Sequence, residues 1–134
     1  MFKKIAHIGI AVKDIGVSGE LFHRLIGKGP DHTENLPEHG VRIAMFNVGD
    51  SQIELTEATD PDSPIARFVD NRGEGIHHIS FIVDDLTSEV ARLRGLGFQM
   101  INEEPRLGAD GRYVLFLHPK STNGVLIELS QKKS

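Results

Sequence analysis

The chain of 134 residues is long enough for one compact domain or two very small modules. Its 15 basic and 19 acidic side chains give a net charge of −4, which argues against a nucleic-acid partner because such surfaces normally carry a basic excess. No cysteine is present, which excludes disulfides, a thiol nucleophile and thiolate metal ligands. The apolar runs are far shorter than the roughly 20 residues of a membrane helix, and no signal-peptide core follows Met1. We therefore expect a cytoplasmic protein with no membrane partner.

The sequence contains one internal repeat. Residues 7–15 read HIGIAVKDI and residues 78–86 read HISFIVDDL, so His7 aligns with His78 at an offset of 71. The triplet IEL stands at 53–55 and again at 127–129, at an offset of 74. Two matches in the same order and at nearly one offset indicate a duplicated module. Each copy carries a histidine early and a glutamate late.

The first copy begins with an alternating strand over residues 5–12. One face of this strand carries Ile8, Ile10 and Val12, and the other carries His7, Gly9 and Ala11. Asp14 is placed to cap a helix that ends at Gly27 and Gly29. The apolar residues that predict this helix recur at i, i+4 and i+8, and they are Val17, Leu21 and Leu25.

The next elements are loops, two strands and a short linker helix. We expect loops over 30–40, strands over 41–48 and 52–56, and a hairpin turn at 49–50. A polar linker follows, in which Ser63 as N-cap and Pro64 at the first helical position predict a short helix. This helix should run through Val69 and close at Gly73.

The second copy predicts the same order of elements. A strand over 76–83 precedes a helix that Asp85 caps and that ends at Gly95 and Gly97. The inward residues of this helix should be Leu86, Val90 and Leu93. Later strands are expected over 98–102, 113–117 and 125–129, with a turn over 108–111.

Together these elements predict an α+β fold built from two tandem βαβββ modules. The modules cover residues 3–58 and 75–131, and the linker with its short helix covers 59–74. Modules of this size are too small to bury their sheets separately, so we expect a single domain over 1–134 in which one curved mixed sheet forms a trough.

The alternation of the strands places four ionisable side chains on the face of the sheet opposite the apolar residues. His7 lies on the face of its strand opposite Ile8 and Ile10, and the repeat makes His78 its equivalent. The two glutamates, Glu54 and Glu128, each stand between Ile and Leu. If the modules are related by a pseudo-twofold axis, two imidazoles and two carboxylates converge, a donor set that suits a divalent transition metal. We expect His77 to pack nearby, and His23, His32 and His39 to lie on the surface.

These patterns resemble the vicinal oxygen chelate superfamily, which has the glyoxalase fold, and within it the methylmalonyl-CoA epimerases. The resemblance covers nearly the whole chain, and the segments that carry it are KIAHIGIAVKDI, LPEHGV, IEL, DSPIARF, GEGIHHISFIVDD, EEPRLGADG and HPKSTNGVLIEL. It implies metal ligation by His7, His78 and Glu128, with Glu54 at the fourth position. It also implies a divalent ion, Co²⁺ first and Mn²⁺, Ni²⁺ or Zn²⁺ as alternatives, and a homodimer.

The activity that the resemblance implies is the interconversion of (2R)- and (2S)-methylmalonyl-CoA in propionate metabolism, by α-proton abstraction through a metal-stabilised enolate. Inversion requires a proton to leave one face of the carbon and return to the other, so two bases are needed. The repeat offers Glu54 and Glu128 for these catalytic roles. A base that some relatives carry in the second-strand region does not transfer directly, since residues 41–43 read VRI and only Glu38 is near.

The acyl-CoA substrate is long and anionic, and the loops around 103–121 offer groups that could bind it. Lys120, Ser121 and Arg106 are the candidate substrate-binding residues, with Arg112 also available for phosphates or the substrate carboxylate.

Three other hypotheses for the function remain open. A lactoylglutathione lyase of the glyoxalase I type would use the same metal set, and the loops around 103–121 distinguish it. An iron-dependent extradiol-type dioxygenase would need only two histidines and one carboxylate. A metal-free ligand-binding module would have no use for four converging ionisable groups.

Overall fold

The computed structural model describes residues 1–108 and 111–132, and the chain forms two compact units. The first unit is His7–His77, and the second unit combines Met1–Ala6 with His78–Ser134. Two strands pass between the units along the chain: β1 (Phe2–Val12) runs from the second unit into the first, and β5 (Gly75–Val83) runs from the first into the second.

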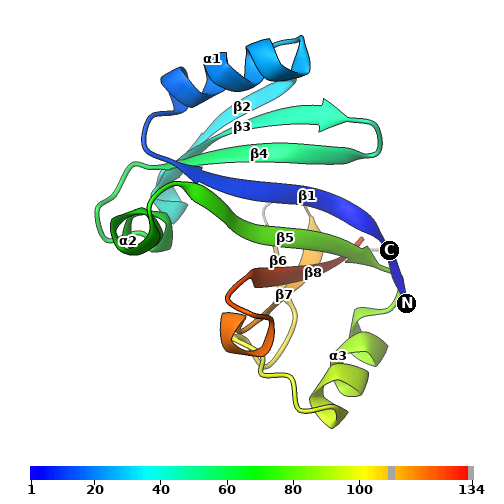
Figure 1. Cartoon of the computed structure of the whole chain (residues 1–134). Coiled ribbons are helices and arrows are strands. Elements are labelled where there is room, and N and C mark those ends of the chain that lie inside the picture. The colour runs from blue at the N-terminus through cyan, green and yellow to red at the C-terminus, as the bar shows by residue number, and fades with distance from the viewer. Residues whose placement is uncertain (109–110, 133–134) are drawn as a thin grey trace. The chain divides into compact units, whose positions relative to one another are not determined.

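The first unit contains strands in the spatial order β2-β3-β4-β1. Its other elements are α1 (Ile15–Ile26), β2 (His32–Leu36), the 3-10 helix η1 (Pro37–His39), β3 (Val41–Val48), β4 (Ser51–Ala58) and α2 (Pro64–Arg72). β2, β3 and β4 are antiparallel neighbours, whereas β1 pairs with β4 in parallel. Helix α1 packs on β3 and β4, as Figure 1 shows.

The second unit repeats this plan with the spatial order β5-β8-β7-β6. Its other elements are α3 (Leu86–Gly95), β6 (Arg106–Leu107), β7 (Arg112–Leu117), the 3-10 helix η2 (Pro119–Ser121) and β8 (Leu126–Lys132). β5 pairs with β8 in parallel, and β8, β7 and β6 are antiparallel neighbours. The predicted α+β class and the βαβββ order of both modules are therefore confirmed.

Two apolar clusters form in the first unit, one on each side of its strands. Val12, Phe46 and Leu55 pack with α1, whereas Ala11 and Val41 pack with α2. Ala11 follows His7 by four residues on an alternating strand, so α2 covers part of the face that carries His7. Among the described residues of the second unit, the buried apolar cluster lies on the α3 side, where Val83, Leu115 and Leu129 pack with the inward residues of α3.

The inward residues of α3 are as predicted, but those of α1 are not. Leu86, Val90 and Leu93 are buried in α3, whereas the apolar residues Val17, Leu21 and Leu25 of α1 are exposed. Helix α1 instead packs through Ile15, Phe22 and Ile26. The helix therefore has two apolar stripes, and the one that contains Phe22 is buried. Burying a large apolar side chain stabilises the fold by about 1.5–3 kcal/mol.

Both long helices begin with the same pair of caps. Asp14 accepts hydrogen bonds from the N–H groups of Gly16 (2.9 Å) and Val17 (3.1 Å), and Asp85 accepts one from Ser88 N–H (3.1 Å). A second cap comes from the last strand of each unit. Glu57 accepts from Ile15 N–H and Gln131 accepts from Leu86 N–H, both over 2.7 Å. Glu57 and Gln131 are equivalent in the repeat, since they follow Glu54 and Glu128 by three residues.

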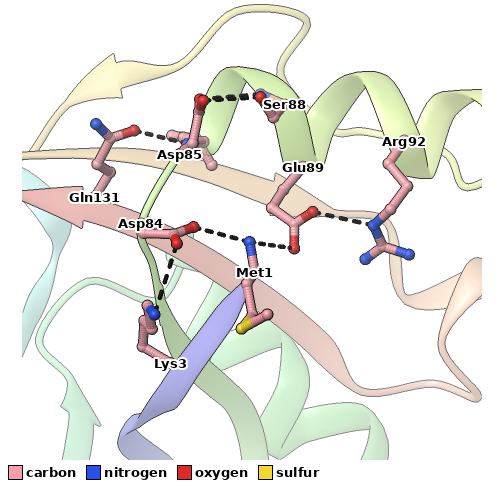
Figure 2. Close-up of polar contacts among 9 residues, drawn as sticks. Met1, Lys3, Asp84, Asp85, Ser88, Glu89, Arg92 and Gln131 are labelled. Carbon is pink, nitrogen blue, oxygen red and sulfur yellow. Dashed lines mark hydrogen bonds and ion pairs between the residues drawn. The ribbon is translucent and has the colours of Figure 1, made fainter.

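The start of α3 also carries a network of charged groups, drawn in Figure 2. The α-amino group of Met1 lies 2.8 Å from Asp84 and 3.2 Å from Glu89, and Lys3 lies 3.7 Å from Asp84. Glu89 is buried and also accepts a hydrogen bond from Arg92 Nε over 3.0 Å. Arg92, with the amino group of Met1, lowers the pKa of Glu89, so that this buried carboxylate stays ionised.

The linker helix and the hairpin turn follow the predictions, whereas the loop over 30–40 and the strand over 98–102 do not. Ser63 accepts from Ala66 N–H and α2 closes at Gly73, while Gly49 has the positive φ of a hairpin turn. The loop expected over 30–40 contains the strand β2, whose polar sequence HTENL has no apolar alternation to reveal it. The predicted turn over 108–111 includes residues 109 and 110, which lie outside the described residues.

The strand expected over 98–102 is absent from that described segment. Only Met100 makes an isolated bridge, to Leu117. The amide of Asn102, which is buried, accepts from Phe116 N–H over 2.9 Å and donates to Glu104 O, so a side chain occupies positions that a strand's backbone would take. The short β6 follows instead, at a place where no strand was predicted.

In the described part of the chain no helix has the length and apolar character needed to cross a membrane.

The second caps generate a stability prediction. Gln131→Ala should lower the free energy of unfolding by roughly 0.5–2 kcal/mol, the usual cost of losing a helix cap, because Leu86 N–H loses its acceptor. Gln131→Glu keeps an acceptor oxygen and should stay near wild type. Urea unfolding followed by circular dichroism measures the difference, with Gln99→Ala at an exposed position as control. Equal unfolding free energies for Gln131→Ala and the wild type would contradict this role.

Candidate functional site

In the first unit, the predicted ligands His7 and Glu54 lie together. They come from the parallel pair β1 and β4, in which Gly9 stands opposite Glu54. His7 and Gly9 share one face of β1, so the imidazole and the carboxylate project from the same face of the two strands. His7 Nε2 lies 4.0 Å from Glu54 Oε2, and only 18% and 14% of these side chains is exposed.

In the second unit, His78 and Glu128 have the same register. They come from the parallel pair β5 and β8, in which Ser80 stands opposite Glu128. In both units, therefore, the residue two positions after the histidine faces the glutamate. That residue is Gly9 in one unit and Ser80 in the other, and both are small and buried. A small residue at this position leaves room beside the carboxylate.

The observed donors fit a metal ion. Imidazole nitrogen and carboxylate oxygen bind divalent transition metals at about 2.0–2.2 Å, so two ligands of one ion lie no more than about 4.4 Å apart. The 4.0 Å between His7 Nε2 and Glu54 Oε2 satisfies this limit. The absence of sulfur from the donor set favours ions of borderline hardness over soft ones.

Two buried hydroxyl groups stand two residues after the glutamates, and the sequence analysis missed both. Thr56 is buried and its hydroxyl donates to Glu54 Oε1 over 3.1 Å. The equivalent residue is Ser130, which is 3% exposed and accepts from Arg112 Nε over 3.2 Å. Extending the IEL repeat by two residues, to IELTE and IELSQ, would have identified these hydroxyls and the second helix caps.

The antiparallel neighbours of the glutamate strands complete each face. Opposite Glu54, Thr56 and Ala58 stand Met45, Ile43 and Val41. Opposite Glu128, Ser130 and Lys132 stand Phe116, Val114 and Arg112. These two sets of neighbouring residues are equivalent in the repeat at an offset of 71, and two of the three positions are apolar in both units. At the third position, Val41 in the first unit corresponds to Arg112 in the second.

Comparison with known proteins identifies the family. Residues 6–116 match the family model described as glyoxalase/bleomycin resistance protein/dioxygenase superfamily. The chain belongs to this superfamily. This result confirms the resemblance to vicinal oxygen chelate proteins that the repeated histidines and glutamates indicated.

Within the superfamily, the chain is similar to methylmalonyl-CoA epimerases over nearly its full length. It is 37% identical to the mitochondrial methylmalonyl-CoA epimerase of Homo sapiens, with 96% of this chain and 73% of that protein covered. It is 36% identical to the ethylmalonyl-CoA/methylmalonyl-CoA epimerase of Cereibacter sphaeroides, with 98% and 99% covered. Among solved structures, Streptomyces coelicolor methylmalonyl-CoA epimerase in complex with 2-nitronate-propionyl-CoA matches with a TM-score of 0.86 and 36% identity, covering 100% and 97%. The resemblance to enzymes of this epimerase family is thereby confirmed.

The three predicted substrate-binding residues lie in two elements: Lys120 and Ser121 in η2, and Arg106 in β6. Lys120 is exposed in η2, and its backbone N–H donates to His118 Nδ1 over 3.1 Å. The hydroxyl of Ser121 accepts from Gln99 N–H over 2.9 Å, a bond that holds the segment after α3. Arg106 stands opposite Val114 and so shares the face that carries Glu128.

The other histidines and Glu38 also have clear positions. His77 packs edge-on against Phe68 of α2, with ring centroids 5.0 Å apart. His23, His32 and His39 are exposed, as expected. Glu38 is exposed in η1.

The first unit also has a cavity of about 610 Å³, which lies between α1 and the strands β2 and β3. Its lining includes His23 and Arg42 but neither His7 nor Glu54. Arg42 lies on the α1 side of β3, as Ala44 does, so this cavity lies mainly on the side of the strands away from His7 and Glu54.

Proposed function

We propose that the protein is a methylmalonyl-CoA epimerase, which interconverts the (2R) and (2S) forms of methylmalonyl-CoA by moving the α-proton. The observation that carries this proposal is the likeness over nearly the whole chain to epimerases of that name, one of them solved with 2-nitronate-propionyl-CoA. The matching register of the two histidine–glutamate pairs supports it, because inversion needs one proton-accepting group for each face of the carbon and each pair supplies a carboxylate.

We further propose that His7, His78 and Glu128, with Glu54 as the fourth ligand, hold one divalent ion. Co²⁺ is the ion that we expect first, and Mn²⁺, Ni²⁺ and Zn²⁺ have compatible donor preferences. The separation of His7 and Glu54 and the nitrogen–oxygen donor set support this part of the proposal. When bound, the ion supplies Lewis-acid stabilisation of the negative charge that develops on the acyl oxygens.

The proton transfers are assigned to the two glutamates. The α-hydrogen of methylmalonyl-CoA lies between a thioester and a carboxylate, and its removal leaves an enolate. A single base that stays in place would return the proton to the face it came from, so inversion needs a second group. We propose that Glu128 and Glu54 serve the two faces, since the repeat makes them equivalent. The Thr56 hydroxyl fixes the orientation of the Glu54 carboxylate.

Recognition of the CoA moiety is assigned to the cations near η2 and β6. Lys120 is exposed, and Arg106 faces the same side as Glu128, so both can meet phosphate groups. The Ser121 hydroxyl already accepts a backbone hydrogen bond, and we assign it the role of shaping the loop that presents Lys120. We also propose that the protein is a homodimer, as the family resemblance implies, and that it is located in the cytoplasm. Light scattering of the purified protein tests the dimer.

The ligand assignment is tested by replacing adjacent histidines. His78→Ala should lose its metal because one of the nitrogen ligands is removed, whereas His77→Ala should keep it because His77 packs against Phe68. Metal content after dialysis, measured by elemental analysis, distinguishes the variants, and circular dichroism checks that both fold. Equal loss of metal in both variants would mean that the register assigned to this strand is wrong.

The activity itself is tested by proton exchange. Wild-type protein incubated with a single enantiomer in deuterated water should incorporate deuterium at the α-carbon and produce the other enantiomer. Glu54→Gln keeps the shape and an oxygen ligand but removes the proton-accepting charge. If Glu54 is a base, this variant should keep its metal and its exchange from one enantiomer, while epimerisation falls by roughly 10²–10⁴-fold.

The same experiment separates a ligand from a base. Near wild-type epimerisation by Glu54→Gln would show that Glu54 is only a ligand, and the second base would then be sought first at Glu38. A wild-type protein that exchanges no α-proton from either enantiomer would contradict the proposed activity altogether.

A further inference from the structure

Arg112 lies on the same face of the second unit as Glu128. It begins β7 and stands opposite Lys132 of β8, while Phe116 of the same strand stands opposite Glu128. Because residues directly opposite in an antiparallel pair share a face, and every second residue along a strand does too, Arg112 and Glu128 project from one side of the strands. Arg112 is half-buried there.

The guanidinium is held in place from the glutamate strand. Arg112 Nε donates to Ser130 Oγ over 3.2 Å, and Ser130 is 3% exposed. Ser130 follows Glu128 by two residues, a spacing of about 7 Å along an extended strand. The hydrogen bond therefore places the guanidinium close enough to the Glu128 carboxylate, which we assign as a base, for one small acyl group to contact both.

The repeat shows that this arginine departs from the plan that the units share. Its equivalent in the first unit is Val41, which packs with Ile65 of α2. Among the described residues of the second unit, the only α-helix is α3, and it packs on the opposite face with Leu115 and Leu129. The position that one unit covers with a helix and fills with an apolar side chain thus carries a cation in the other.

The distances favour the acyl end of the substrate over the CoA phosphates. Arg112 is the first residue of β7 and Lys120 follows the last, so the length of a strand of about 17 Å separates their backbones. The residue pair Phe116 and Glu128 lies between them. The free carboxylate of the substrate is bonded directly to the carbon that loses its proton, whereas the phosphates are many bonds away. A cation close to the base and away from Lys120 suits the carboxylate.

We propose that Arg112 binds the free carboxylate of the malonyl group and so selects acyl-CoA thioesters that carry one. This inference rests on the proposed function, which supplies the substrate class. The guanidinium offers paired donors that match the two oxygens of a carboxylate, and Ser130 acts as the positioning residue that holds Nε.

The test measures binding of two thioesters that differ only in the carboxylate, methylmalonyl-CoA and propionyl-CoA, by isothermal titration calorimetry. In Arg112→Gln, the dissociation constant of methylmalonyl-CoA should rise by roughly 10- to 100-fold, the usual range for a hydrogen bond to a charged group. The constant of propionyl-CoA should stay within about twofold, which also shows that the variant is folded. Ser130→Ala should weaken methylmalonyl-CoA binding by less than Arg112→Gln does.

Lys132→Gln is the matched control, because Lys132 is the exposed cation directly opposite Arg112. It should leave both dissociation constants near wild type. Equal weakening of both thioesters in Arg112→Gln would overturn the proposal and assign Arg112 to the CoA moiety, and no change in either constant would also overturn it. A wild-type protein that binds methylmalonyl-CoA in the Arg112-dependent way but does not epimerise it would contradict the proposed activity alone.

Discussion

The parallel pairing of the first and last strands of each unit is the constraint on which the site depends. A shift of one residue in either pair would turn a glutamate from the face that carries the histidine to the helix face, because successive side chains point to opposite sides. Each pair is held by an interaction outside the strand ladder. Glu57 and Gln131 bind the first backbone amides of α1 and α3, and each follows its glutamate by three residues. The cap therefore ties the helix to the strand on one face while the glutamate projects from the other.

The two units share this arrangement and differ in what stands beside it. In the first unit the face carrying His7 is partly covered by α2, and Thr56 fixes the Glu54 carboxylate. In the second unit the equivalent hydroxyl, Ser130, holds Arg112 instead. In our proposals, proton transfer on the two faces of the carbon uses the two glutamates, which are equivalent in the repeat. Recognition of the substrate carboxylate uses Arg112, which has no equivalent cation in the first unit.

The sequence predicted the elements whose signals are local or repeated. The helix caps Asp14, Asp85 and Ser63 were found because a short polar side chain before an apolar run has few other uses. The placement of each histidine and glutamate on one face of its own unit followed from strand periodicity. The buried face of α1 could not be found in this way, because two apolar stripes compete on that helix and only packing against Phe46 and Leu55 decides between them.

The remaining errors arise where side chains replace backbone pairing or where polarity hides a strand. Asn102 bonds to Phe116 N–H in place of a strand over 98–102, and no periodicity distinguishes such a contact from a ladder. The edge strand β2 is polar because it packs little. The position of Arg112 beside Ser130 required the pairing of β7 with β8, which the sequence alone does not set.

We have proposed that the two histidine–glutamate pairs together hold one divalent ion that the epimerisation requires. The most direct measurement is to strip the purified protein with a chelator and to add Co²⁺ stepwise, following bound metal and epimerisation of methylmalonyl-CoA in the same samples. We expect negligible activity in the stripped protein and a linear rise that reaches its plateau at one ion per chain. Full epimerisation by protein that contains no divalent ion would contradict it.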